Sequence, residues 1–331
     1  MTSAEYHRLS VRARNTLSSL TRDVMRRVRA VYQEAAREVA EKVAVASLAE
    51  TLAGQSRLTT QSLASIELQL KEAVRVIADA IETEGTAGIT RSVERIGTIN
   101  DRFMSEAFNR AGSTQIDRAV IGEIVSGVNE QVVQSVVNRV WQDGYTFSHR
   151  CWIAGQRFQD DIKNVLASGL AQGRDVLKIA KDIQIYTADG KVRLMQRYGT
   201  LQRGTREFAK RIPKAVDYRA LRLVRTELYA SLRDASVEQG KINPAATGLW
   251  DWVRQGSVDW GCDCPDFASG GPYTLDALPS TPHANCLCGT VPRLQPTAEF
   301  NDRLREWADG GADPGLDQWY RDVYLPAERA A

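Results

Sequence analysis

The distribution of proline is the sequence feature that most constrains how this chain can fold. All ten prolines lie between Pro213 and Pro326, and none precedes them. Proline breaks helices because it lacks an amide donor and its ring clashes with the preceding turn. The long proline-free part of the chain can therefore be helical throughout.

Apolar residues recur every three or four positions over the first 145 residues, the spacing of one face of a helix. Each of four stripes is followed by glycine, which accepts the left-handed conformation that ends many helices. No glycine precedes Gly54, so the first helix is expected to be about 45 residues long, well beyond the usual length. The stripes run from Leu17 to Val39, from Leu63 to Ile81 with an end at Gly85, from Ile89 to Phe103 with an end near Gly112, and from Ile116 to Val136 with an end at Gly144.

Residues 1–145 are therefore predicted to form a stalk or bundle of long helices. Such apolar stripes need partner helices, which belong either to the same chain or to other copies in an assembly. Residues 146–240 are predicted to be a helical, basic middle region, with caps at Ser148 and Asp175 and a last helix from Asp217 to Gly240.

The amino-acid composition changes after Gly240. Residues 241–296 are rich in Gly, Pro, Asp and Ser, and Trp250 and Trp252 alternate as in a strand, which predicts a small module of short strands and loops. Residues 297–331 are expected to be a C-terminal tail, with a short helix from Asp302 to Trp307 and an extended segment after it. The predicted fold class is mainly α, with a small α+β Cys-rich module near the C-terminus.

Four of the five cysteines lie close together in this module, as two pairs near a histidine. The sequence has no run of 18 apolar residues and no visible secretory signal, so we expect no membrane span and synthesis in a reducing cytosol. In that compartment a cysteine cluster usually binds metal, and zinc takes four such ligands in a tetrahedron. The candidate ligands are Cys262, Cys264, His283, Cys286 and Cys288.

The spacing of the pairs leaves three interpretations open. Structural zinc sites usually have two residues between paired cysteines, and here there is one. Zinc remains one interpretation, with His283 able to replace one thiolate. A disulfide across the loop, formed after cell lysis, and packed thiols without metal are the others.

Charge is unevenly distributed although the net charge is only +2. Residues 113–240 carry 20 basic and 14 acidic groups, and residues 241–331 carry 7 and 13. Such a difference in charge between two parts of the chain suits an assembly component that touches different partners, or it belongs to an ordinary solvated surface. The densest basic stretch would attract phosphate backbones in a salt-dependent way, or pair with an acidic protein surface. Its candidate contact residues are Arg203, Arg206, Lys210, Arg211 and Lys214.

Several short motifs of residues 160–295 occur in the order found in one known family. They are Gly169–Ile183, Arg225-Thr226-Glu227, Trp250 followed by Cys262 and Cys264, Gly271-Pro272-Tyr273, and Pro282-His283 followed by Asn285-Cys286-Leu287-Cys288. In these motifs the chain resembles the phage head-morphogenesis (minor capsid, Mu F-like) family. It departs from the family at Cys262-Asp263-Cys264, where two intervening residues are common, and at Leu287, where arginine is usual.

The resemblance implies a structural protein of the phage virion, made in the host cytoplasm and present in several copies at the portal vertex inside the head. Its implied partners are the portal protein, other head proteins and packaged double-stranded DNA, with which it could be ejected. A zinc-dependent nucleic-acid-binding protein is the alternative function.

We expect a structural role for Arg225, Glu227 and Trp250, and no enzymatic activity. Glu227 is predicted either to be a buried carboxylate that holds the Trp250 strand or Arg225, or to form a surface salt bridge. His149 and Cys151 are close in sequence, but no third group that would orient a nucleophile–base pair is evident.

Overall fold

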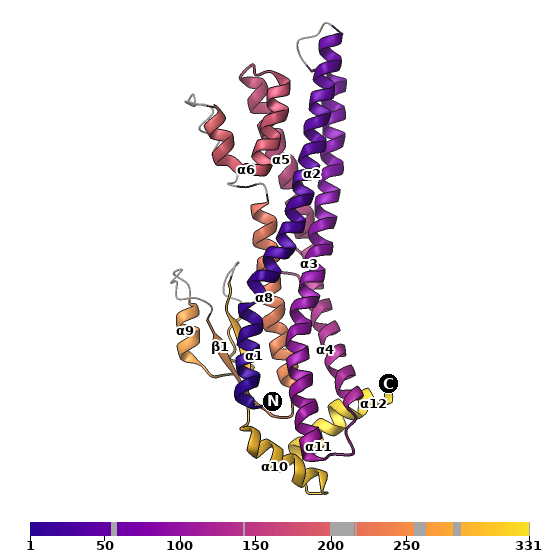
Figure 1. Cartoon of the computed structure of the whole chain (residues 1–331), viewed down its shortest axis with the longest axis vertical. Helices are drawn as coiled ribbons and strands as arrows, with labels where there is room; N and C mark the ends of the chain where they lie inside the picture. The colour runs from indigo at the N-terminus through magenta and orange to yellow at the C-terminus, as the bar shows by residue number, and fades with distance from the viewer. Residues whose placement is uncertain are drawn as a thin grey trace. The chain divides into compact units, whose positions relative to one another are not determined.

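A computed structural model describes residues 1–53, 58–141, 143–198, 215, 217–254, 263–280 and 286–330, without the side chains of residues 189–198. The prediction of a mainly α fold with a small sheet near the C-terminus is confirmed. Figure 1 shows the helices and the small sheet. The helices are α1 (Ser3–Asn15), α2 (Leu17–Leu52), α3 (Thr60–Ala111), α4 (Arg118–Asn138), α5 (Phe147–Ala171), α6 (Val176–Tyr198), α8 (Tyr218–Lys241), α9 (Cys264–Gly270), α10 (Thr297–Ala308), α11 (Pro314–Trp319), a π-helical turn (Tyr320–Tyr324) and α12 (Leu325–Ala330).

The predicted long helices are present, but two of their expected ends were wrong. The first helical region is divided at Thr16, so that α1 has 13 residues and α2 has 36. The expected end at Gly85 does not exist, because α3 continues through it for 52 residues. Gly85 lies directly beneath Phe147, since a Cβ atom there would be 2.5 Å from the Cζ atom of that ring. This glycine allows close approach between helices and does not end one. Gly112 does follow the end of α3, with a φ of 68°.

The chain divides into two compact units. Unit 1 contains Met1–Thr21, Thr86–Asn138 and Arg225–Ala331, and unit 2 contains Arg22–Gly85 and Arg139–Val224. Three of the boundaries fall inside α2, α3 and α8, and the fourth follows the last residue of α4. Neither unit coincides with one of the four consecutive segments expected from the sequence, because helices distant in the chain pack together.

Unit 2 buries the apolar stripes of α2 and α3 against each other and against α5. Val28 and Val39 of α2 and Ile77 of α3 are completely buried. Tyr32 of α2 meets Phe158 of α5 edge to face, with ring centroids 5.7 Å apart. For these stripes the partner helices therefore belong to the same chain.

The closest helix contact in unit 2 supports a stability prediction. A Cβ atom at Gly155 of α5 would lie 2.5 Å from the backbone oxygen of Val74, and that oxygen cannot move without shifting α3. We expect Gly155→Ala to lower the free energy of unfolding by about 1–3 kcal/mol through overpacking. Urea unfolding measures this change. Gly127 of α4 is the matched control, because a Cβ atom there meets nothing within 4 Å. Gly127→Ala should raise the free energy by roughly 0.5–1 kcal/mol, and equal effects of the two substitutions would contradict the prediction.

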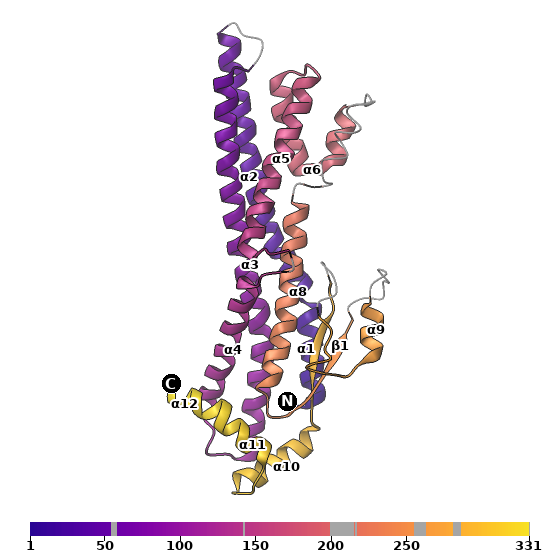
Figure 2. The same cartoon turned by 180° about the vertical axis from the view of Figure 1, so that it is seen from behind.

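In unit 1, α8 lies beside α3 and α4, as both views show (Figures 1 and 2). A buried amide network fixes this arrangement. The Asn100 amide donates to the side-chain oxygen of Gln239 at 2.9 Å, and the Gln239 amide donates to Asn129 Oδ1 at 2.9 Å. Asn243 donates to Asn100 Oδ1 at 2.7 Å. Since an unsatisfied buried amide is costly, this network specifies the register of α8 against its neighbours.

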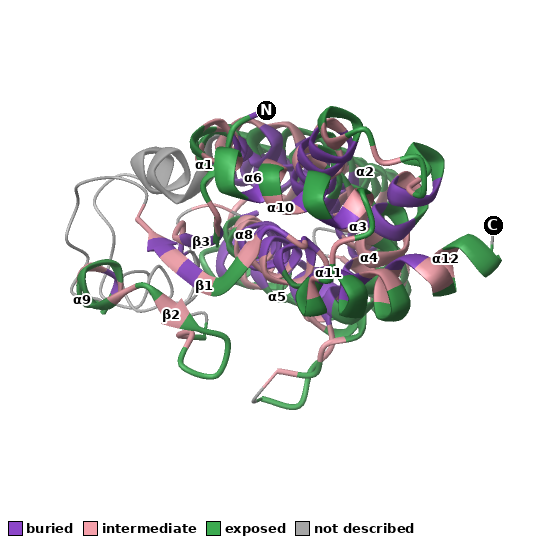
Figure 3. Ribbon diagram, turned by 90° about the horizontal axis from the view of Figure 1, so that it is seen from below, coloured by how far each residue is buried: buried purple, intermediate pink, exposed green. Residues whose placement is uncertain are grey.

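The expectation of an extended C-terminal segment was wrong. Residues from Pro314 to Ala330 are helical, and Leu316, Trp319 and Tyr324 are buried. Asp313 accepts a hydrogen bond from the Leu316 amide, and Pro314 occupies the first turn of α11, where its missing amide costs nothing. The Trp319 indole donates to the Ile242 oxygen at 2.7 Å. The last helix, α12, has no buried residue among those described and is green toward its end in Figure 3.

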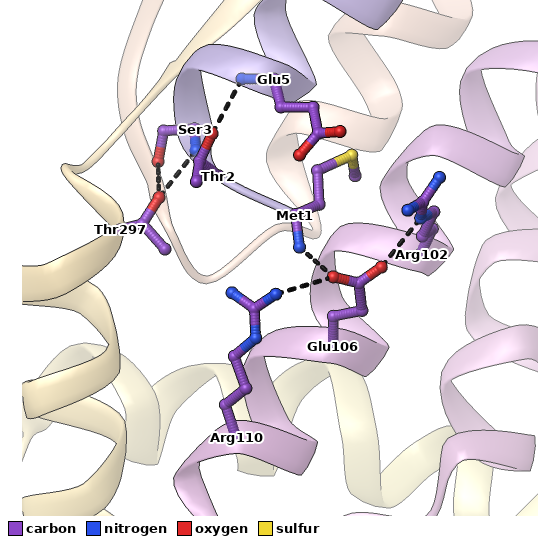
Figure 4. A network of polar contacts seen from close by, with 8 residues as sticks. All are labelled: Met1, Thr2, Ser3, Glu5, Arg102, Glu106, Arg110 and Thr297. Atoms are coloured by element: carbon purple, nitrogen blue, oxygen red, sulfur yellow. Dashed lines mark hydrogen bonds and ion pairs between the residues drawn. The ribbon is translucent and has the colours of Figure 1, made fainter.

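The first turn of α1 is attached to α3 and α10 by the contacts in Figure 4. The Met1 amine pairs with Glu106, which also accepts from Arg102 at 2.8 Å and from Arg110 at 3.1 Å. The amine and Arg102 hold the pKa of Glu106 well below its usual value. The Ser3 amide donates to Thr297 Oγ1 at 2.7 Å. Within the described residues, no helix is both long and apolar enough to cross a membrane.

Candidate metal centre

The strand register of the small sheet brings the two cysteine segments together. Strands β1 (Ala246–Val253), β2 (Tyr273–Thr274) and β3 (Gly289–Leu294) form an antiparallel sheet in the order β2-β1-β3. Val253 at the end of β1 pairs with Gly289 at the start of β3. Cys286 and Cys288 therefore lie just before β3, beside the end of β1. The other described cysteine of the module, Cys264, begins α9.

Two tryptophans of β1 attach this sheet to its neighbouring helices. A Cβ atom at Gly240 of α8 would lie 3.1 Å from Trp250 Nε1, so the helix contacts the buried face of the strand directly. Ser236, one turn earlier, donates to the Thr290 oxygen at 2.7 Å. Trp252 meets Phe267 of α9 edge to face, with centroids 5.3 Å apart. These contacts position α9, and with it Cys264, beside the sheet.

Three thiols converge at this point. The Sγ atoms of Cys264, Cys286 and Cys288 all lie within 4.8 Å of one another, and Cys264 and Cys286 are buried. The distance from Cys264 Sγ to Cys286 Sγ is 3.6 Å, far longer than a disulfide bond of about 2.05 Å. Sulfurs arranged tetrahedrally at about 2.3 Å from a zinc ion lie about 3.8 Å apart. The cluster thus has the spacing of metal ligands, and the described cysteines form no disulfide.

The local environment keeps Cys286 protonated when no metal is bound. A hydrogen bond with the Cys288 thiol and burial both raise the pKa of the Cys286 thiol. Oxidation proceeds through the thiolate, so this environment disfavours disulfide formation. A divalent cation displaces such protons by binding the thiolates.

Arg14, near the end of α1, lies against the cluster. Its guanidinium donates to the Val253 oxygen and, at 3.2 Å, to the Arg254 oxygen. A Cβ atom at Gly289 would lie 3.1 Å from Arg14 Cδ, so the Arg14 side chain packs closely against this glycine. Burial lowers the pKa of Arg14, while the nearby Cys288 thiol, Tyr229 hydroxyl and Cys286 thiol oppose this effect.

The structure brings together three of the five predicted metal ligands. Cys262 and His283 lie outside the described residues, as do the predicted contact residues Arg203, Arg206, Lys210, Arg211 and Lys214.

Of the residues with predicted structural roles, Trp250 is buried and Arg225 is partly exposed. Glu227 is completely buried, which excludes an exposed salt bridge. That Glu227 holds the Trp250 strand or Arg225 stays a prediction.

Sequence reasoning missed Arg14 and the buried carboxyl of Asp161. Both carried a signal, because each interrupts an apolar helix face with a charge. Arg14 follows Tyr6 and Ser10 along the buried side of α1, and Asp161 lies between Phe158 and Ile162 on the buried side of α5.

The Asp161 residue in unit 2 is buried. Only 4% of the residue is exposed, and Tyr186 Oη lies 3.5 Å from Oδ2, at the long limit of a hydrogen bond. Burial raises the pKa of Asp161 to about 7, although Arg219 opposes the shift. The carboxyl is therefore protonated over most of the acidic range.

Comparisons with models of protein families, with curated proteins and with solved structures found no match to this chain.

Proposed function

We propose that this chain is a structural, non-enzymatic component of a phage head, of the minor capsid type, whose Cys-rich module is held together by zinc. One observation carries the proposal: Cys264, Cys286 and Cys288 converge within 4.8 Å from two separate segments. They do so in the same unit as Arg225-Thr226-Glu227 of α8 and Trp250 of β1, the other motifs of the family resemblance.

The chemistry of the ligand set supports zinc. Thiolates suit a soft or borderline cation, and a closed site of four protein ligands is typical of structural zinc. Cys262 or His283 would supply the fourth ligand. A module with three short strands and one short helix has little apolar core, so a metal would supply much of its folding free energy.

The long helices support a role in assembly. They present large surfaces to other head proteins, and several copies would surround the portal vertex inside the head. In this proposal the basic stretch from Arg203 to Lys214 contacts either the portal protein or packaged DNA, with which the protein could leave the particle.

Particles of the phage that encodes this chain provide the direct test. Mass spectrometry should find the protein in purified virions, and cryo-EM should show its density beside the portal, inside the head. Absence from purified virions would refute the head role. A portal gene immediately upstream in the genome would be supporting evidence obtained at little cost.

Binding to DNA is tested by its dependence on salt. Each phosphate contact contributes about −0.9 to the slope of log K against log salt concentration. Replacing Arg203, Arg206, Lys210, Arg211 and Lys214 with glutamine should therefore reduce the steepness of that slope by up to about 4.5. Fluorescence anisotropy with a labelled duplex measures the slope.

A variant with five glutamines at exposed basic positions of other segments, Arg8, Arg12, Arg26, Lys42 and Arg91, is the matched control. No binding of the wild type at low salt would remove DNA from the proposal. Tight, zinc-dependent binding by the isolated protein would instead favour the alternative of a zinc-dependent nucleic-acid-binding protein.

A further inference from the structure

The Arg14 guanidinium is a buried cation whose charge the described residues do not balance. The residue is 3% exposed, and no described carboxylate lies within 4.0 Å of it. Its Nε is buried without a hydrogen-bond partner among the described residues. The two hydrogen bonds to the Val253 and Arg254 oxygens satisfy donors but bring only partial charges. A buried cation without an opposite charge is costly, and proteins rarely retain one.

The titratable groups nearest this cation are the thiols of Cys288 and Cys286 and the hydroxyl of Tyr229. Arg14 packs against Gly289, which directly follows Cys288, and it donates to the oxygens of Val253, the last residue of β1, and of Arg254. Neutral thiols do not balance a guanidinium. A zinc ion bound by the three described thiolates has a net charge of −1. Such a centre would supply the negative charge that the described residues around Arg14 do not.

We propose that Arg14 is a positioning residue that balances the negative charge of the metal–thiolate centre and thereby makes the attachment of α1 to the module dependent on the metal. The inference rests on the proposed zinc centre. When zinc binds, the thiols release their protons to solvent and the centre becomes an anion, to which Arg14 is the adjacent cation. The contacts of Met1 with Glu106 and of Ser3 with Thr297 attach the start of α1, the helix that carries Arg14, to α3 and α10.

Zinc affinity of full-length variants tests the role of the charge. Arg14→Met keeps an apolar chain of similar reach but removes the charge, and it should weaken zinc binding by about 10- to 100-fold, the usual effect of losing a residue that supports the ligands. Arg14→Lys keeps the charge and should bind zinc within a few-fold of the wild type. Arg12→Met is the matched control, since Arg12 is an exposed neighbour on the same helix. Competition with a chromophoric chelator measures the affinities.

The outcomes separate this inference from the metal site itself. Wild-type protein without zinc in native mass spectrometry would refute the zinc centre and the inference with it. Wild type with zinc, and Arg14→Met with unchanged affinity, would refute only the role of Arg14. Equal losses in Arg14→Met and Arg14→Lys would mean that shape, and not charge, is required, and would also overturn the inference.

Hydrogen exchange gives a second readout. Chelation of zinc should speed exchange in the last turn of α1, at Val11–Thr16, and the increase should be smaller in Arg14→Met, because the module loses its metal in both proteins but only the wild type also loses the counter-charge of Arg14. The amides of α10, which belong to the same unit, should change little. Identical exchange of Val11–Thr16 with and without zinc would overturn the proposal.

Discussion

Replacing Cys286 with serine is expected to abolish stoichiometric zinc binding and to unfold the Cys-rich module. Cys286 is the central thiol of the cluster, buried and 3.6 Å from Cys264 Sγ. Structural zinc contributes on the order of 10 kcal/mol to the folding of small domains, comparable to the entire stability of a typical domain. Native mass spectrometry should show the loss of one zinc per chain, and exchange of the β1 and β3 amides should become fast.

Cys151→Ala is the matched control for this substitution. Cys151 is also a buried cysteine, but it belongs to α5 in unit 2 and not to the cluster. The variant should keep one zinc per chain and protected β1 and β3 amides. If Cys286→Ser retains zinc and a folded module, the cluster is not a metal centre, and packed thiols become the better interpretation.

Asp161→Asn is expected to stabilise the protein above neutral pH by up to roughly 4 kcal/mol. Burial raises the folded-state pKa of this carboxyl from 3.8 to about 7, and each unit of difference corresponds to about 1.4 kcal/mol. Between these pH values the folded state holds a proton that the unfolded state has released, so stability falls as pH rises from about 4 to about 7. Asparagine is neutral throughout and removes this loss.

Urea unfolding at pH 5 and at pH 8 measures the effect. The variant should be more stable than the wild type at both pH values, by about 1.7 kcal/mol at pH 5 and by roughly 4 kcal/mol at pH 8. Asp160→Asn is the control, because Asp160 is the exposed neighbour on the same helix and should change stability by less than about 0.5 kcal/mol. A variant less stable than the wild type at pH 8 would mean that the attraction between Arg219 and ionised Asp161 outweighs the cost of burial.

The sequence was sufficient for the classes of element and for the cysteine cluster. Helical periodicity and the absence of proline depend only on local chain chemistry, so α2, α3, α4 and α8 could be predicted. The two cysteine pairs also indicated a common site before any strand register was known. Cys264, Cys286 and Cys288 indeed lie within 4.8 Å of one another.

Helix ends depended on neighbours that the local sequence does not reveal. Gly85 looks like a helix end, yet it lies in mid-helix, where the Phe147 ring occupies the space that a side chain would need. The C-terminal segment was expected to be extended, yet it is helical because Trp319 and Tyr324 find a core formed by distant residues. In both places the deciding contact is with a residue far away in the chain.

The cysteine module shows the same division. The amino-acid sequence alone identified the paired cysteines as candidate metal ligands. Only the tertiary structure placed Arg14 of α1 beside Gly289, 275 residues later in the chain, where its buried charge faces the thiols. Electrostatic and packing energies depend on distance in space and not on separation along the chain, so a sequence pattern could not reveal this neighbour.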